Sequence, residues 1–196
     1  VDVGGAAQRD YLKRLGLLSS PAIELPEVGH PLSPARWREI NTMTISYGHG
    51  IAVSPLQLAG AVSTLVNGGV QYGPTLLRHE KGKPIAGERV LTADTSRKIR
   101  GLMELVVKHG TGKNASVAGY RIGGKTGTAE KQVGGRYRKK DLISSFVGAF
   151  PMENPRYVVL ALVDEPHGNK STFNYATGGW VAAPVVGRII ERMAPL

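Results

Sequence analysis

A short glycine-rich segment, GGKTGTAEK at residues 123–131, holds the residue types best suited to chemistry in this 196-residue chain. If the segment is a strand, its side chains alternate between two faces, so Thr126 and Thr128 share one face and Lys125 points to the other. The two hydroxyls would then be about 6.6 Å apart, a span that could bracket a bound carboxylate. Gly127 adds no bulk between them, and the pattern predicts a substrate held along the strand by main-chain hydrogen bonds.

The same letters permit two other interpretations. A bare Lys-Thr-Gly triplet can be a glycine-containing edge strand with an ordinary surface lysine. GYRIGGKT, at 119–126, also fits the phosphate-loop spacing, but that turn should not contain Tyr, Arg and Ile, and the residues after Thr126 make a poor helix start. The apolar hairpin and helix expected further along the chain favour a functional strand over both alternatives.

The other polar residues give weaker signals. Asp164, Glu165 and His167 invite an acid–base interpretation, but a solvated strand end explains them better. No metal site is predicted, because metal-binding spacing is missing among the five histidines, His30, His49, His79, His109 and His167.

Composition limits the class of protein. With 41% hydrophobic residues and no low-complexity tract, the chain can bury a core. It has no cysteine, which excludes disulfides and thiolate metal sites, and no apolar run of the roughly 18 residues that a membrane helix needs. The net charge of +10 favours anionic partners, but the densest basic run, RYRKK at 136–140, is short and aromatic residues make up only 6%. That run is interpreted as a solvated hairpin tip, and no nucleic-acid partner is expected.

Three helices are expected. The first begins at Pro55 with Ser54 as its N-cap and ends at Asn67-Gly68-Gly69. The second covers 95–108, and the third covers 184–193. The second is predicted from the spacing of Ile99, Leu102, Met103 and Val106. The first fifty residues hold an amphipathic stretch at 6–15 and then a proline-rich segment, and no definite element is predicted there.

Three strands are expected at residues 120–129, 144–150 and 156–164. The last two flank PMENP, a turn with a proline at each end, and therefore form an antiparallel hairpin. Because RYVVLALV is apolar at nearly every position, the last strand is expected to be covered on both faces. Helices, then strands, then a closing helix, with no repeated strand-helix-strand unit, predict an α+β fold in which helices flank an antiparallel sheet.

Three separated blocks resemble one family, in that family's order. They are SYGHGIAVSPLQLAGAVSTLVNGG (46–69), GYRIGGKTGTAEK (119–131) and GGWVAAPVVGRIIERM (178–193). Together they resemble the later part of the transpeptidase domain of monofunctional, division-type (class B) penicillin-binding proteins, whose third signature is K-T-G. The resemblance covers nearly the whole chain from about residue 10 and implies part of the penicillin-binding, serine β-lactamase-like fold. His49 departs from the family, which more often carries an aromatic residue there.

The nucleophile signature of that family is missing from the chain. No serine has a lysine three residues later, and S-x-N is missing as well. We therefore expect residues 1–196 to be a C-terminal part of a transpeptidase domain that lacks the S-x-x-K and S-x-N segments, and we expect the chain alone to be inactive. Alone, it would leave the strand at 156–164 with an unpaired edge, which predicts association with another chain.

The resemblance implies roles for the matching residues. Lys125 would face the serine of the missing S-x-N segment and assist proton transfer, and the backbone N–H of Thr128 would be one oxyanion donor. Thr126 and Thr128 would bind the terminal carboxylate of the peptide, with Gly127 part of the same substrate-binding wall. Tyr175, in the loop before the closing helix, would line the substrate cleft.

The implied function is cross-linking of peptidoglycan stem peptides through an acyl-serine intermediate, without a cofactor and with β-lactams binding at the same site. Two alternatives remain: a D,D-carboxypeptidase or serine β-lactamase with the same threonines, and a noncatalytic basic binding module. The parent protein is expected at the periplasmic, extracytoplasmic face of the inner membrane, within a division complex. Its anchor is expected outside this chain, because the first residues, VDVGGAAQRD, do not resemble a signal peptide.

Overall fold

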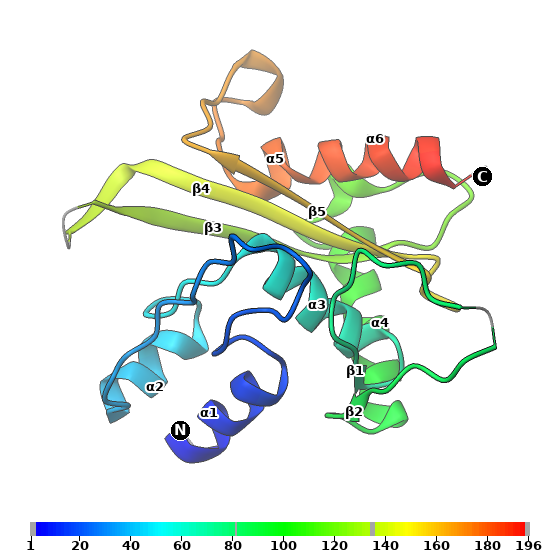
Figure 1. The fold of residues 1–196 in the computed structure, drawn as a ribbon. Coiled ribbons are helices and arrows are strands. Elements are labelled where there is room, and N and C mark those ends of the chain that lie inside the picture. The colour runs from blue at the N-terminus through cyan, green and yellow to red at the C-terminus, as the bar shows by residue number, and fades with distance from the viewer. Residues whose placement is uncertain (1–2, 81, 134–135, 195–196) are drawn as a thin grey trace. The chain divides into compact units, whose positions relative to one another are not determined.

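The chain forms two compact units, Val1–Thr95 and Ser96–Leu196. The computed structural model describes residues 3–80, 82–133 and 136–194 (Figure 1). Helices and antiparallel strands are both present, so the predicted α+β class is confirmed. Among the described helices, none is both long enough and apolar enough to cross a bilayer.

The first unit is mainly helical. Its elements are α1 (Gly5–Arg14), α2 (Glu39–Ser46), α3 (Pro55–Val66), and the short antiparallel strands β1 (Val70–Gln71) and β2 (Glu88–Arg89). The amphipathic stretch near the N-terminus is α1, and the proline-rich segment after it is irregular, as expected. Helix α2 is not predicted from the sequence because its apolar residues do not form one buried face: Ile45 is buried, whereas Ile40 and Met43 are exposed.

The predicted start of α3 is confirmed in detail. The Ser54 hydroxyl accepts a hydrogen bond from the Gln57 backbone N–H at 3.2 Å. In return, Gln57 Oε1 accepts from the Ser54 backbone N–H at 2.9 Å, which completes a capping box. The helix ends before Gly68 and Gly69, which both have positive φ, a conformation that suits the glycines at the stop.

The second unit contains the three-stranded sheet. Helix α4 (Ala93–Lys108) leads into the 3-10 turn η1 (Lys113–Ala115), and the sheet follows with β3 (Gly123–Val133), β4 (Arg136–Phe150) and β5 (Tyr157–Asp164). The strand order is β3-β4-β5, antiparallel throughout. The turn η2 (Lys170–Thr172) and helices α5 (Gly178–Val181) and α6 (Ala183–Met193) complete the unit, and α5 and α6 lie along one side of the sheet (Figure 1).

The core of the second unit lies between β4 and α6. Phe146 and Phe150 from β4 pack with Val186 and Ile190 from α6, and none of these four side chains is more than 2% exposed. Val107, near the end of α4, joins the same cluster. Burying each such side chain contributes about 1.5–3 kcal/mol, so the core fixes α4, β4 and α6 as one frame.

Two predictions about the second unit are corrected. Helix α4 begins two residues earlier than predicted, and its buried face includes Val107 rather than Leu102, which is 63% exposed. Strand β5 is not covered on both faces: Val159 and Ala161 pack on the core, whereas Leu162 on the opposite face is 46% exposed. The run of apolar letters in β5 therefore does not show burial on both sides.

The acidic residues after β5 form ion pairs at a solvated strand end. Lys131 Nζ lies 2.9 Å from Asp164 and 2.8 Å from Glu165, and both carboxylates are more than half exposed. Hydrogen bonds to Glu165 and Asp164 raise the pKa of Lys131. These contacts agree with the interpretation of Asp164 and Glu165 as a solvated strand end. The basic run at 136–140 is where β4 begins, and residues 134 and 135, where part of the predicted hairpin tip falls, lie outside the described residues.

Candidate active site

The lysine and two threonines of the K-T-G-T segment lie inside β3. Gly127 pairs with Ser145 and Thr128 with Ser144, so the ladder to β4 continues through the segment without interruption. Within the described residues, β3 ends the sheet, and its other edge has no paired strand. A phosphate loop would need a turn into a helix here, so the strand interpretation is confirmed.

The predicted alternation of side chains in β3 is also confirmed. Thr126 and Thr128 point to the side covered by α5, where Thr128 Oγ1 accepts a hydrogen bond from the Gly178 backbone N–H at 3.1 Å. Lys125 lies on the other face and is exposed, and its Nζ donates to the Thr126 carbonyl oxygen at 2.7 Å. The lysine and the threonine hydroxyls therefore lie on opposite faces of the same strand.

The threonine face of β3 opens into a cavity of about 610 Å³. This volume falls within the roughly 300–1,000 Å³ range typical of small-molecule sites. Among the described residues that line it, the only charged one is Lys113, so the cavity suits an anionic group. The lining residues are Gly110, Thr111, Lys113, Asn114, Thr126, Thr128, Thr177, Gly179 and Trp180.

The hydrogen bonds of the two threonines determine what they can offer a ligand. Thr126 Oγ1 and Thr111 Oγ1 are 2.8 Å apart, and either hydroxyl can donate. When Thr111 donates, the Thr126 proton is available to a ligand acceptor. Thr128 already accepts from Gly178, so its own proton is available as well. Two hydroxyl donors facing one cavity match the two oxygens of a carboxylate.

The loop that forms the opposite side of this cavity is not predicted from the sequence. Thr111 contacts Thr126, and Asn114 Nδ2 donates to the Gly179 carbonyl oxygen at 2.9 Å, which joins the loop to α5. The backbone N–H groups of Gly110 and Gly112 both donate to the Val106 carbonyl oxygen at the end of α4. In the sequence, this loop is only a polar, glycine-containing segment after a helix, and that pattern does not show which residues it contacts.

Tyr175 lies beside the cavity but does not line it. Its ring stacks on Trp180 with centroids 5.9 Å apart, and Trp180 is a lining residue. Phe173 contacts Trp180 edge-on, and both Phe173 and Tyr175 are more than half exposed. The predicted role of Tyr175 in substrate binding is therefore indirect in this geometry and stays a prediction.

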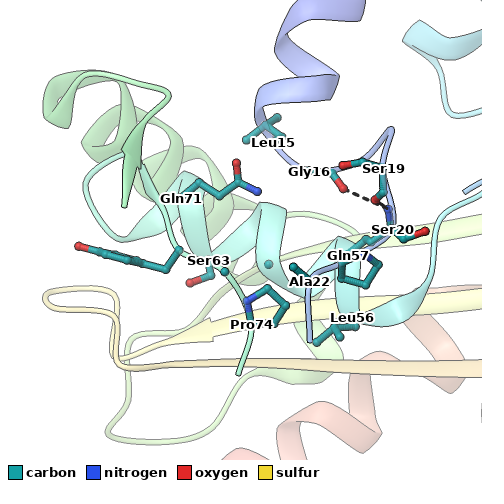
Figure 2. Close-up of a pocket in the computed structure, with 14 residues that line it drawn as sticks. Leu15, Gly16, Ser19, Ser20, Ala22, Leu56, Gln57, Ser63, Gln71 and Pro74 are labelled. Carbon is teal, nitrogen blue, oxygen red and sulfur yellow. Dashed lines mark hydrogen bonds between the residues drawn. The ribbon is translucent and has the colours of Figure 1, made fainter. Parts of the chain in front are cut away.

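A second cavity, of about 410 Å³, lies in the first unit (Figure 2). One wall is held by the buried Gln57 side chain, whose Nε2 donates to the carbonyl oxygens of Gly16 at 3.0 Å and Ser19 at 2.8 Å. Its described lining contains none of the predicted site residues and no charged residue. Across the part of the chain that the structure describes, no group of three or more His, Cys, Asp or Glu side chains could hold a metal ion.

The chain is similar to known proteins of one family. A family model described as the penicillin-binding protein transpeptidase domain matches residues 2–191. The chain is 42% identical to the probable peptidoglycan D,D-transpeptidase FtsI of Caulobacter vibrioides, over 98% of this chain and 34% of that protein. It is 39% identical to stage V sporulation protein D of Bacillus subtilis, over 94% of this chain and 30% of that protein. The chain thus spans about a third of the length of these curated relatives.

Solved structures show the same fold. The transpeptidase domain of Burkholderia pseudomallei penicillin-binding protein 3 superimposes with a TM-score of 0.86 at 37% identity, covering 97% of this chain and 57% of that one. Penicillin-binding protein 3 of Mycobacterium tuberculosis, solved in complex with ampicillin, gives a TM-score of 0.83 at 27% identity, covering 98% of this chain and 47% of that one.

Proposed function

The chain belongs to the penicillin-binding protein transpeptidase family, and from this membership we propose that it supplies one wall of the active site of a peptidoglycan D,D-transpeptidase. The names of the relatives favour this reaction over the carboxypeptidase, the β-lactamase and the noncatalytic binding module. The serine nucleophile would lie on a segment outside these 196 residues, since the chain has no S-x-x-K.

The proposed reaction has two acyl-transfer steps. The serine oxygen attacks the carbonyl carbon between the two terminal D-alanines, the C–N bond breaks, and the last D-alanine leaves with the proton from the serine hydroxyl. The amine of a second stem peptide then attacks the ester, which forms the cross-link and returns a proton to the serine. Lys125 would assist proton transfer from its own face of β3.

One observation carries the assignment of the binding wall. The hydroxyls of Thr126 and Thr128 face the cavity, and each lies beside a group that can donate to it, so both hydroxyls can donate to a carboxylate there when Thr111 donates to Thr126. The stem peptide ends in a carboxylate, and Lys113 adds a positive charge to the lining. The wall is therefore suited to the terminal carboxylate rather than to a neutral part of the substrate.

The edge of β3 that is free within the described residues supports binding of the peptide backbone of the substrate. A peptide added alongside β3 would extend the β3-β4-β5 sheet by one strand through main-chain hydrogen bonds. Gly127 leaves room for that approach, and the Thr128 backbone N–H would serve as one oxyanion donor, with the other on the nucleophile segment. Removing one such donor typically slows acyl transfer by about 100- to 1,000-fold.

β-Lactams would occupy the same site, consistent with the ampicillin complex of the Mycobacterium tuberculosis relative. The relatives are cell-wall synthesis proteins, which is consistent with activity in the cell envelope. Within the envelope, we assign the parent protein to the extracytoplasmic face of the inner membrane and to a division complex.

Acylation of the full-length protein by fluorescent penicillin tests the proposal. We expect Thr126→Val and Thr128→Val each to lower the second-order acylation rate by about 10- to 100-fold, because a hydrogen bond to a charged group contributes about 1.5–3 kcal/mol. A penicillin methyl ester serves as the internal control, since it lacks the carboxylate and should react with both variants at nearly the unmodified rate.

Two results would count against the proposal. If the unmodified full-length protein is not labelled at all, the transpeptidase assignment fails. If the variants lose reactivity with the ester and with the acid to the same extent, the threonines do not recognise the carboxylate. Labelling of the 196-residue chain alone would show that the nucleophile lies within it.

A further inference from the structure

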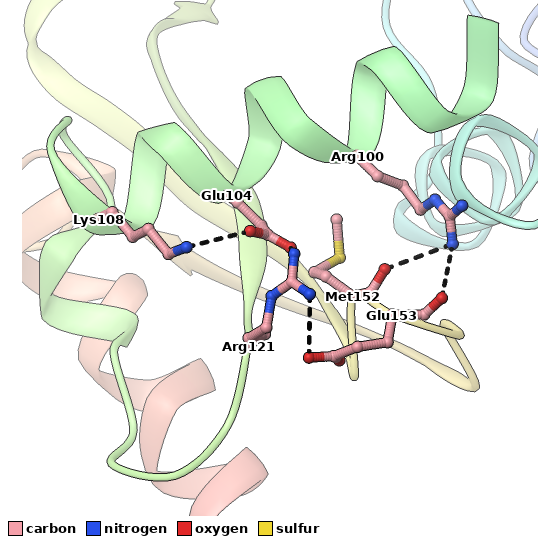
Figure 3. Close-up of polar contacts among 6 residues, drawn as sticks. All are labelled: Arg100, Glu104, Lys108, Arg121, Met152 and Glu153. Atoms are coloured by element: carbon pink, nitrogen blue, oxygen red, sulfur yellow. Dashed lines mark hydrogen bonds and ion pairs between the residues drawn. The ribbon is translucent and has the colours of Figure 1, made fainter. Parts of the chain in front are cut away.

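A group of charged side chains joins α4, the start of β3 and the turn after β4 (Figure 3). We call it the Glu104 cluster, and its members are Arg100, Glu104, Lys108, Arg121 and Glu153. Glu104 is its buried centre, with a side chain only 8% exposed. Its carboxylate accepts from Arg121 Nη2 at 2.6 Å and from Lys108 Nζ at 3.3 Å.

The two cations that bind Glu104 have different connections. Lys108 lies one turn further along α4, so its bond stays within the helix. Arg121 comes from the segment that immediately precedes β3, and it also pairs with Glu153 at 3.3 Å. Burial acts to raise the pKa of Glu104, but the hydrogen bonds from Arg121 and Lys108 outweigh it and hold the pKa below its ordinary value. The carboxylate is therefore charged at neutral pH, and the Arg121 bond crosses between elements.

The start of β3 is tightly enclosed at this point. A side chain at Gly123 would lie 3.0 Å from Met103 Cβ on α4 and 2.5 Å from Met152 Cε, so the strand backbone packs directly against both. The Met152 backbone N–H donates to the Arg121 carbonyl oxygen at 2.9 Å. Arg100 Nη1, also on α4, donates to the Glu153 carbonyl oxygen at 3.1 Å. Helix α4, the start of β3 and the turn after β4 are thus joined at the Glu104 cluster.

The loop that follows α4 contacts β3 inside the candidate site. The Gly112 backbone N–H donates to the Val106 carbonyl oxygen at 3.0 Å, which fixes the loop after α4. That loop carries Thr111, whose hydroxyl lies 2.8 Å from the hydroxyl of Thr126. Two contacts therefore join α4 and the loop after it to this part of the chain, one at Arg121 just before β3 and one at Thr126 within β3.

We propose that Glu104 and Arg121 are positioning residues that keep the Thr126 hydroxyl against Thr111 and aimed at the carboxylate of the ligand. This inference rests on the proposed function, because it assigns the alignment of the same carboxylate-binding wall. A shift of about 1 Å in a binding group can reduce a rate by about 100-fold, so the loss of a 2.6 Å bond between α4 and the start of β3 has a measurable consequence.

The test compares acylation of the full-length protein by fluorescent penicillin and by a penicillin methyl ester. We expect Arg121→Met to lower the rate with the acid about tenfold or more, while the rate with the ester stays within about twofold. A purely structural role would reduce the folded fraction and lower both rates equally. The ratio of the two rates therefore reports positioning independently of stability.

Two further variants sharpen the comparison. Lys108→Met also removes a cation from Glu104, but it leaves the bond between Glu104 and Arg121 intact. Its ratio of acid to ester acylation rates should therefore equal that of the unmodified protein. The double variant Glu104→Met with Arg121→Met also removes the buried carboxylate, which the single variant leaves without its Arg121 partner, and such apolar replacements are often neutral or stabilising. We expect the double variant to show the same low ratio of acid to ester acylation rates as Arg121→Met.

The outcomes separate the inference from the function on which it rests. If the unmodified protein is acylated by neither ligand, the proposed function fails and the positioning role fails with it. If the unmodified protein prefers the acid and Arg121→Met keeps that preference, only the positioning role is overturned. It is also overturned if Lys108→Met loses the preference to the same degree, or if the double variant regains it.

Discussion

Gly178 offers the sharpest test of how α5 positions the threonine wall. Its backbone N–H donates to Thr128 Oγ1 at 3.1 Å, and Gly178 lies over the paired residues Gly127 and Ser145. A Cβ at this position would lie 2.5 Å from the Gly127 carbonyl oxygen and would also overlap the Ser145 carbonyl oxygen. Both oxygens belong to the sheet backbone, so neither can move aside cheaply.

The expected size of the effect follows from that overlap. Cβ contacts under 3.0 Å essentially never occur, so in Gly178→Ala helix α5 must move away from β3 by about 0.5 Å or more. Overpacking of this kind typically costs about 1–3 kcal/mol of folding free energy. Because a displacement of about 1 Å can cost about 100-fold in rate, we expect about a tenfold fall in acylation by penicillin.

The assay is the acylation rate of full-length Gly178→Ala with fluorescent penicillin, measured together with its thermal unfolding. Gly101→Ala is the matched control, because Gly101 lies in α4 and a Cβ there would meet no atom within 4 Å. That control should gain about 0.5–1 kcal/mol of stability and keep its acylation rate. If Gly178→Ala reacts within about twofold of the unmodified protein, or if Gly101→Ala loses as much, close packing at Gly178 does not position the threonines.

Three further predictions concern stability, each measured on the full-length protein. Ser54→Ala removes the N-cap of α3 and should cost about 1 kcal/mol, seen as a lower denaturation midpoint in urea; an unchanged midpoint would contradict a stabilising cap. Ile190→Ala truncates a fully buried side chain and should cost about 2–5 kcal/mol; a melting temperature like that of the unmodified protein would show that the core collapses around the smaller residue. Because the pKa of Glu104 is lowered by folding, its contribution is complete above the unfolded value of 4.5 and is lost as pH falls through the lower folded value. Glu104→Gln should therefore lose less stability than the unmodified protein on acidification below about pH 4.5, and an equal loss would exclude Glu104 as a source of that acid sensitivity.

Local signals in the sequence predict much of the fold. The cap at Ser54 and the glycines after Val66 indicate both ends of α3, because capping and helix termination depend on neighbours in the chain. The apolar spacing of α6 identifies its buried face, including Val186 and Ile190. Local signals miss two features: α2 has no clear apolar stripe, and the exposure of one face of β5 depends on which face packs on the core around α6.

In the candidate site too, local features can be predicted from the sequence and long-range contacts cannot. Alternation along a strand predicts Thr126 and Thr128 on one face and Lys125 on the other, and the structure confirms this arrangement. The partners of the two threonines, Thr111 and Gly178, could not be found from the sequence, because they lie 15 and 50 residues away along the chain.

The sequence by itself determined most of the elements, the strand that carries K-T-G and the family to which the chain belongs. Strand alternation, capping and the order of motifs are properties of neighbouring residues, so they are visible along the chain. Only the tertiary structure decided which groups the threonine hydroxyls contact, which loop lines the cavity, and that Arg121 bonds to a buried carboxylate on α4. These features depend on contacts between distant segments, which packing of the core around Phe146 and Ile190 brings together.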